Sequence, residues 1–160
     1  MAFQFVDRIT QISKNKSVQA LRYLSSTEQY LKDHFAKFPV MPGVLILEST
    51  VQAASWLLRY SDNFEPSLIS LTEVSNVKYG QFVRPGDKLE IKAELTGQNG
   101  NEADFQANAT MNGKAAIRVK FRLKKRPLAD SNETGGKTNE QIREIFRERF
   151  NSISREAVLA

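Results

Sequence analysis

The feature that most constrains this chain is an apolar segment in its first half, which follows Gly43 and reaches about Tyr60 (VLILESTVQAASWLLRY). Such a segment has the length of a helix and is apolar on nearly every side, which is typical of a helix buried in a core. Its longest apolar stretch, Val44 to Leu58, contains Glu48 and Gln52 and is shorter than the ~20 residues that a membrane-spanning helix needs. The sequence therefore predicts a soluble protein built around one buried central helix.

Strand-like stretches lie on both sides of this helix. One precedes it, and four follow it: 17–24, then 68–83, 88–95, 103–111 and 115–123. Asn99-Gly100 and Asn112-Gly113 separate the last three stretches, and Asn-Gly is the strongest short hairpin signal. Since no second helix divides these strands, a parallel βαβ arrangement is disfavoured. The predicted fold class is α+β, with an antiparallel sheet wrapped around one long helix.

The last part of the chain differs in composition from the body. The basic run Lys124-Lys125-Arg126 leads into Pro127 and a polar, glycine-containing stretch, which is typical of a linker. Thr138 and Gln141 then have the spacing of a helix capping box. We therefore expect a body over residues 1–126, a linker over 127–137 and an amphipathic helix over 138–160.

This C-terminal helix has one apolar stripe, formed by Ile142, Ile145, Phe146, Phe150 and Ile153. The stripe favours docking on the body or on a neighbouring subunit, and binding of a separate partner is the alternative. We expect Arg143, Arg147 and Arg149 to face outward, where they would attract an acidic partner.

Composition excludes several classes of site. The chain has no cysteine and one histidine, His34, so thiolate chemistry, disulfides and any site with two imidazoles from one chain are excluded. No Ser-His-Asp, phosphate-binding-loop, dinucleotide-binding or zinc motif is present, and we expect no cofactor and no metal. The net charge of +5 is too small to imply nucleic acid. With no signal peptide in the sequence, we expect a cytoplasmic protein.

Two polar residues, Glu48 and Gln52, interrupt the apolar helix at positions i and i+4 and therefore share one face. A buried carboxylate costs free energy unless it is paired or used. Two interpretations of Glu48 remain open at this point: a catalytic carboxyl group, or a structural one that a buried partner satisfies.

His34 precedes a sharp turn at Pro39 and Pro42 that leads into the helix. The helix N-terminus there offers unpaired N–H groups and the positive end of the helix dipole. Glu48 lies roughly 7–8 Å further along the axis, at 1.5 Å per residue, and its side chain tilts back toward those groups. A lone histidine is more often structural, but here a base, an acid and an anion-binding helix end could surround one substrate.

That combination suits the removal of water from a 3-hydroxyacyl thioester. A base takes the C2 proton while the thioester oxygen gains negative charge, which N–H groups stabilise. The 3-hydroxyl is a poor leaving group and needs a proton from an acid.

The segment from His34 to Glu48 (HFAKFPVMPGVLILE), followed by Gln52-Ala53-Ala54, resembles the active-site segment of the FabZ-type 3-hydroxyacyl-acyl carrier protein dehydratases (HFPxxPxxPGVLxxEAxAQ). Phe5-Val6-Asp7-Arg8-Ile9 is similar to that family's FxxVDRI, and 84–89 (RPGDKL) to its PGDxL. The departures are Asp33 before His34, Ala36-Lys37 after it, and 49–51 (STV) after Glu48.

The resemblance implies a hot-dog fold in a homodimer or trimer of dimers, with active sites between subunits. It also implies His34 as the catalytic base, Glu48 as the acid, and the Gly43 N–H as the group that holds the thioester oxygen. The Val40 carbonyl would orient His34, and Gln52 would support Glu48 through water. The substrate would arrive on an acidic acyl carrier protein, which the basic excess suits.

Two other functions remain as alternatives: an acyl thioesterase of the hot-dog fold, and a non-catalytic module that binds acyl chains or partners. Hot-dog thioesterases usually lack this histidine–turn–glutamate segment. The presence of both His34 and Glu48 argues against the non-catalytic module.

Overall fold

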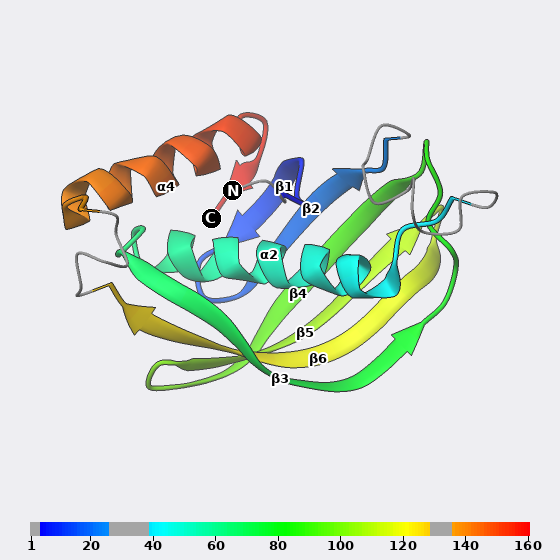
Figure 1. Cartoon of the computed structure of the whole chain (residues 1–160), viewed down its shortest axis with the longest axis horizontal. Coiled ribbons are helices and arrows are strands. Elements are labelled where there is room, and N and C mark those ends of the chain that lie inside the picture. The colour runs from blue at the N-terminus through cyan, green and yellow to red at the C-terminus, as the bar shows by residue number, and fades with distance from the viewer. Residues whose placement is uncertain (1–3, 26–38, 129–135) are drawn as a thin grey trace.

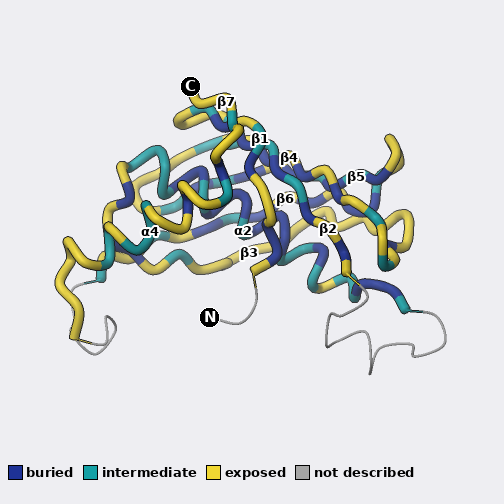
Figure 2. The backbone as a smooth tube through the Cα atoms, turned by 90° about the horizontal axis from the view of Figure 1, so that it is seen from above, coloured by how far each residue is buried: buried dark blue, intermediate teal, exposed yellow. Residues whose placement is uncertain are grey.

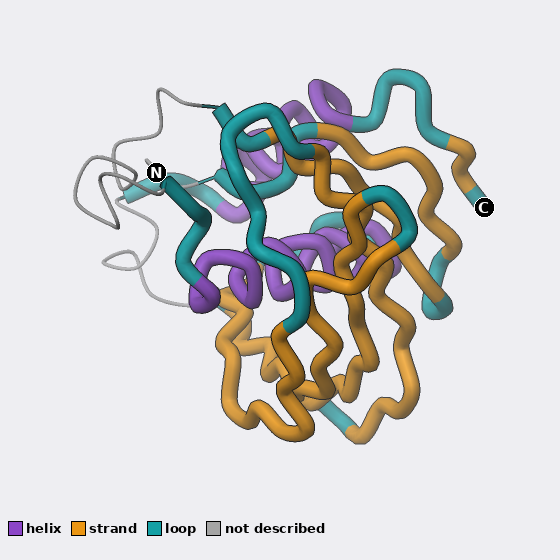
Figure 3. The backbone as a smooth tube through the Cα atoms, turned by 90° about the vertical axis from the view of Figure 1, so that its right-hand side faces the viewer, coloured by secondary structure: helices purple, strands orange, loops and turns teal. Residues whose placement is uncertain are grey.

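The computed structural model describes residues 4–25, 39–128 and 136–160. A seven-stranded sheet curves around the long helix α2 (Gly43–Ser61), and a second helix, α4 (Asn139–Ile153), lies near the C-terminal end of α2 (Figures 1 and 3). The strands are β1 (Arg8–Ser13), β2 (Ser17–Tyr23), β3 (Ser67–Tyr79), β4 (Lys88–Asn99), β5 (Glu102–Met111), β6 (Lys114–Pro127) and β7 (Val158–Leu159). This arrangement confirms the α+β class and the sheet wrapped around one helix.

The order of strands in the sheet is β3-β6-β5-β4-β2-β1-β7. Strands β4, β5 and β6 form the expected antiparallel meander; Asn112-Gly113 forms one turn, and Gly100-Asn101, directly after Asn99, forms the other. Asn112 and Gly113 both have positive φ, 51° and 79°, which the tight turn requires. The meander does not include β3, because β3 pairs with β6 and lies at the edge of the sheet.

Two strands were not expected from the sequence. In β1 a bulge between Ile9 and Gln11 places both Ile9 and Ile12 in the core, so the apolar residues do not alternate with period two. Strand β7 has only two residues, which is too short for a pattern. It pairs parallel to β1, so the sheet is not wholly antiparallel.

The core lies between α2 and the inner face of the sheet, where the tube in Figure 2 is mostly buried. Three buried hydroxyl groups on α2 belong to Ser49, Thr50 and Ser55, and each donates to a carbonyl oxygen one turn earlier on the same helix, at 2.6–3.0 Å. These small polar residues therefore enter the core with their hydrogen bonds satisfied. Neither α2 nor α4 has both the length and the apolar character of a membrane-spanning helix.

Helix α4 packs on the body of its own chain. The capping box at its start is present, with Thr138 and Gln141 bonded in both directions. Phe150 is 3% exposed, and its ring lies 5.2 Å from those of Tyr60 and Phe64 and 6.0 Å from that of Trp56. The apolar stripe thus finds its acceptor on the outer side of α2 and the turn that follows.

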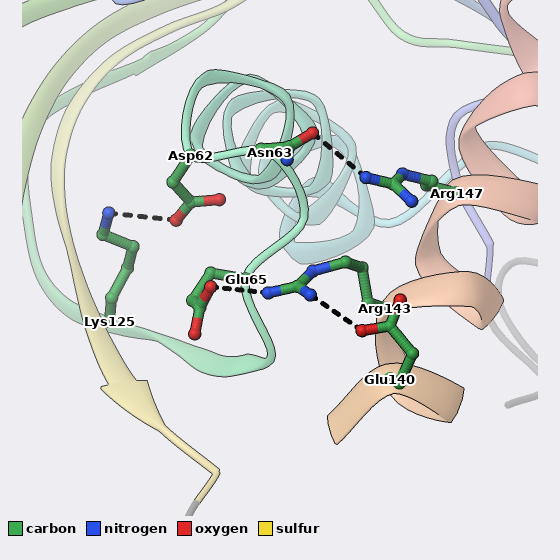
Figure 4. A network of polar contacts seen from close by, with 7 residues as sticks. All are labelled: Asp62, Asn63, Glu65, Lys125, Glu140, Arg143 and Arg147. Carbon is green, nitrogen blue, oxygen red and sulfur yellow. Dashed lines mark hydrogen bonds and ion pairs between the residues drawn. The ribbon is translucent and has the colours of Figure 1, made fainter. Parts of the chain in front are cut away.

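Polar contacts fix the same junction (Figure 4). Arg143 binds Glu65 at 2.8 Å and Glu140 at 3.0 Å, and Arg147 donates to Asn63 at 3.2 Å. The expectation that Arg143 and Arg147 face outward is therefore wrong, because polar groups at the end of α2 draw both guanidinium groups inward.

Candidate active site

The site begins where the chain enters α2. Pro42 is the N-cap residue, one position before the first helical turn, and Gly43 is the first helical residue. The Met41 N–H donates to the carbonyl oxygen of Val83 at 2.8 Å, which holds the entering segment against the loop after β3. The first turn contains no acidic residue. The positive end of the helix dipole is therefore not neutralised by a side chain of that turn.

Glu48 is half-buried in the second turn of α2 and is bonded to Gln52, as the i, i+4 spacing predicts. The Gln52 Nε2 donates to Glu48 Oε1 at 3.1 Å, and Gln52 Oε1 accepts the backbone N–H of Phe5 at 2.8 Å. Gln52 therefore links the carboxyl group to the N-terminal segment of the chain. The contact between Gln52 and Glu48 is direct.

The N-terminal segment is itself held by a partly buried ion pair. Arg22 is 5% exposed and binds Asp7 at 3.2 Å, and its guanidinium lies 5.2 Å from the centre of the Phe5 ring. The same Asp7 carboxylate also accepts a hydrogen bond from the backbone N–H of Tyr23 at 2.6 Å. The role of this segment could not be read from the sequence, because hydrogen bonds to a backbone N–H leave no residue pattern.

Tyr79, at the end of β3, contacts the start of the helix. A Cβ atom placed on Gly43 would lie 3.0 Å from Cε1 and Cζ of the Tyr79 ring and 3.3 Å from its hydroxyl oxygen. A side chain at position 43 would therefore require the Tyr79 ring to shift by a few tenths of an ångström. A tyrosine hydroxyl is protonated at neutral pH and can donate a hydrogen bond, and partial burial raises the pKa of Tyr79 further above its ordinary value. Sequence reasoning missed Tyr79, because 36 residues separate it from Gly43.

The other expected site residues are placed only in part. His34 lies outside the described residues, so its distance to Glu48 remains a prediction. Val40 is 2% exposed and immediately precedes the Met41–Val83 bond. Within the described ranges no group of three His, Cys, Asp or Glu side chains is arranged to hold a metal ion.

Comparison with known proteins identifies the family. The model of the FabA-like domain matches residues 1–120. The 3-hydroxyacyl-[acyl-carrier-protein] dehydratase FabZ of Lactococcus lactis subsp. cremoris is 36% identical over 116 residues, which cover 72% of this chain and 80% of that protein. The FabZ protein of Levilactobacillus brevis is 34% identical over 112 residues, covering 70% and 76% respectively.

Solved structures support the fold. A chain of the dehydratase heterocomplex ApeI:P from Xenorhabdus doucetiae superimposes with a TM-score of 0.66 at 16% identity, over 84% of this chain and 90% of that one. The protein smu.793 from Streptococcus mutans, bound to acetyl CoA, gives a TM-score of 0.61 at 15% identity, over 79% and 93%. The matched family model and relatives cover most of the chain, and the family model includes the segment that carries Gly43, Glu48 and Gln52. The chain therefore belongs to the FabA-like family and, within it, to the FabZ-type 3-hydroxyacyl-[acyl-carrier-protein] dehydratases.

Proposed function

We propose that this protein removes water from 3-hydroxyacyl thioesters carried by an acyl carrier protein and releases trans-2-enoyl thioesters, with His34 as base and Glu48 as acid. The observation that carries the proposal is the hydrogen-bonded chain from Glu48 through Gln52 to Phe5. It holds a half-buried carboxyl group one turn inside a helix N-terminus that no acidic side chain of the first turn neutralises.

The reaction uses each group once. The His34 imidazole takes the C2 proton, and the electron pair of that C–H bond forms the C2–C3 double bond as the C3–O bond breaks. The Glu48 carboxyl group gives its proton to the departing oxygen, which leaves as water. Because Gln52 donates to Glu48 Oε1, we assign the transferred proton to Oε2.

The Gly43 N–H is the proposed donor to the thioester oxygen. It is the first N–H of α2, so the helix itself provides no partner for it. A donor fixed in this way stabilises the negative charge that develops on the oxygen as the C2 proton leaves. The Val40 carbonyl is the proposed partner of the His34 ring, which would fix the orientation of the base.

We also propose that the site is completed by a second copy of the chain, with His34 from one subunit and Glu48 from the other. The long edge strand β3 supports this arrangement, because among the described strands it pairs only with β6. It also carries apolar side chains that are more than a third exposed: Leu68, Leu71, Val74 and Val77. A second β3 would pair with the open edge and cover these side chains. The resemblance to the family also allows a trimer of such dimers.

We expect the reaction to take place in the cytoplasm.

The test of the function is a direct assay. The protein is incubated with a 3-hydroxyacyl thioester, and absorbance of the conjugated 2-enoyl product is followed. His34→Ala and Glu48→Gln should each lower kcat by at least ~10²-fold while the circular dichroism spectrum stays unchanged. Mixing the two variants under conditions of subunit exchange should restore part of the activity, because hybrid dimers contain one intact site.

The same assay separates the alternatives. Release of free thiol without a 2-enoyl product would identify a thioesterase. Binding of acyl thioesters with no turnover would identify a non-catalytic module. Wild-type rates in either single variant would contradict the proposed roles of His34 and Glu48.

A further inference from the structure

The outer face of the sheet carries a cluster of three cations, which we call the basic cluster: Lys78, Arg118 and Lys120. Lys78 on β3 is directly opposite Arg118 on β6 in the antiparallel register. Lys120 is two residues further along β6 and therefore on the same face. All three side chains are exposed.

No acidic side chain of the described residues forms an ion pair with the basic cluster. The neighbouring positions on β5 are Asn108, opposite Arg118, and Gln106, opposite Lys120, and both are neutral. Next in the same row on β4 is Lys92, which is already paired with Glu94 at 3.2 Å. Like charges directly opposite each other destabilise a sheet, so this arrangement has a cost that nothing within the described sheet offsets.

The next position on the same face of β6 is a useful contrast. Arg122 is surrounded by three carboxylates: Asp104 at 2.7 Å, Glu73 at 3.2 Å and Glu102 at 3.9 Å. Along the outer face of β3 and β6, the position of Arg122 is therefore neutralised and that of the basic cluster is not. Such a division along a single pair of strands points to a ligand for the basic cluster.

The basic cluster lines an open hollow of about 520 Å³. The remaining lining includes the side-chain amides of Asn76, Gln106 and Asn108, which can donate to carboxylate oxygens. Lys78 directly precedes Tyr79, whose ring contacts Gly43, so the hollow lies at the same end of β3 as the start of α2, on the opposite face of the sheet. Arg143 and Arg147, which the sequence suggested for an acidic partner, are bonded to the body instead.

We propose that the basic cluster is the surface on which the acidic acyl carrier protein docks while its acyl arm enters the active site. This proposal rests on the proposed function. A protein partner fits better than nucleic acid, because Glu73 and Asp104 interrupt the cationic row directly after Lys120 and would repel a continuous phosphate backbone. The carboxylates of an acidic helix need only a local patch of this kind.

The test compares two charge-reversed variants of the full chain. One carries Lys78→Glu, Arg118→Glu and Lys120→Glu, and the matched control carries Lys16→Glu, Lys124→Glu and Arg155→Glu, which are exposed cations elsewhere. Each variant lowers the net charge by six, from +5 to −1. Any difference in activity between the two variants therefore depends on where the charges lie and not on the net charge. Each is assayed with a 3-hydroxyoctanoyl acyl carrier protein and with the N-acetylcysteamine thioester of the same acid, which has no carrier.

The cluster variant should raise KM for the carrier-bound substrate at least ~10-fold and weaken its dependence on salt, while kcat/KM for the small thioester stays within twofold of wild type. The control variant should behave as wild type with both substrates. Equal losses in the two variants, or no loss in the cluster variant, would overturn the docking surface.

Direct binding of the carrier protein, measured by calorimetry, keeps the two proposals separate. If the wild-type protein binds the carrier but shows no dehydration, the proposed function is wrong. The docking surface is then tested separately, by whether the cluster variant binds the carrier protein more weakly than the wild type does. If the wild-type protein binds duplex DNA more tightly than the carrier protein, and the cluster variant abolishes that binding, the assignment to an acidic protein is wrong.

Discussion

Gln52 connects two parts of the molecule that are 47 residues apart, and this link is the clearest relation between the fold and the proposed chemistry. Its amide donates to Glu48 and its oxygen accepts from the Phe5 N–H, so both ends of one side chain are used. The amide cannot rotate without breaking both bonds. The carboxyl group of Glu48 is therefore held in one orientation.

We predict that Gln52→Leu lowers kcat about 10–100-fold, the equivalent of losing one hydrogen bond of about 1.5–3 kcal/mol to the negative charge that develops on Glu48 as its proton leaves. Gln52→Glu is the companion variant, because it keeps an acceptor for the Phe5 N–H and loses the donor to Glu48. It should show a similar loss of kcat. A wild-type kcat in Gln52→Leu would show that the bond does not serve catalysis.

The contact between Gly43 and Tyr79 gives a second prediction at this scale. Gly43→Ala places a methyl group 3.0 Å from the tyrosine ring, so this half-exposed ring has to shift, and we expect a destabilisation of up to about 1 kcal/mol. Tyr79→Leu should relieve the contact, so the double variant should be more stable than the sum of the single effects predicts. Urea unfolding of all four proteins measures this coupling, and additive effects would contradict it.

The sequence was informative about Glu48, Gln52 and Gly43, because all three lie within ten residues of one helix. It did not predict the contacts of Phe5, in the segment before β1, or of Tyr79, at the end of β3, with the same helix. Residues brought together only by the closed fold leave no short-range spacing in the sequence.

Helix α4 shows what one buried aromatic ring does for an otherwise polar element. Phe150 is the residue of α4 that is fully buried, and three rings of the body surround it. Arg59 of α2 lies 5.5 Å from the centre of the Trp56 ring and 4.7 Å from that of Phe146, and burial lowers its pKa to about 10. The junction is therefore aromatic at its centre and charged around it.

We predict that Phe150→Ala destabilises the protein by about 3–5 kcal/mol, since it leaves a cavity among three rings. The exposed Glu148→Ala on the same helix is the control and should change stability by less than about 0.5 kcal/mol. Turnover of the small thioester by the folded fraction of Phe150→Ala should persist, because α4 contributes no group to the proposed site. Loss of that turnover in a folded protein would place α4 in the active site.

The end of α2 gives a prediction about pH. Burial raises the pKa of Asp62 above its ordinary value of 3.8, and the opposing effect of the Lys125 ammonium at 3.1 Å does not cancel it. Between 3.8 and the raised value the folded state binds more protons than the unfolded state, so this group lowers stability as pH rises through that window.

Asp62→Asn should remove this effect. The difference in unfolding free energy between Asp62→Asn and wild type should therefore shift in favour of the variant as pH increases from 3.5, and level off once the carboxyl group is ionised in both states. Urea unfolding of both proteins at several pH values between 3.5 and 7 measures this difference. The contributions of the other acidic groups are the same in both proteins and cancel when one unfolding free energy is subtracted from the other. A shift in the opposite direction would mean that the ion pair with Lys125 outweighs burial.

The elements differed in how well they could be predicted. The hairpins of β4, β5 and β6 follow from alternation and Asn-Gly turns, and α2 follows from length and hydrophobicity alone. Strands β1 and β7 could not be predicted, because the bulge in β1 interrupts its alternation of apolar and polar residues and β7 is too short to have one. The position of β3 beside β6 depends on which sheet edge is available, and local sequence does not encode that choice.

At the scale of the whole molecule, the open edge at β3 predicts the assembly. We expect Leu71→Lys with Val74→Lys to produce a folded monomer, because two charged side chains replace apolar ones on the strand that would pair. Sedimentation velocity gives the mass, and kcat should fall at least ~10²-fold if each site needs two subunits. Val158→Lys on β7 is the control, and it should keep the wild-type mass. A double variant that remains dimeric would show that β3 is not the interface.

The parallel pairing of β7 with β1 has a consequence for how copies of this protein add to one another. A sheet with two exposed edges can accept a new copy on each side and so propagate into a fibre. Here residues 158–160 bond to part of the β1 edge, which leaves β3 as the long edge for a newcomer. When two such edges meet around a two-fold axis, each satisfies the other, and strand-to-strand growth stops after one addition.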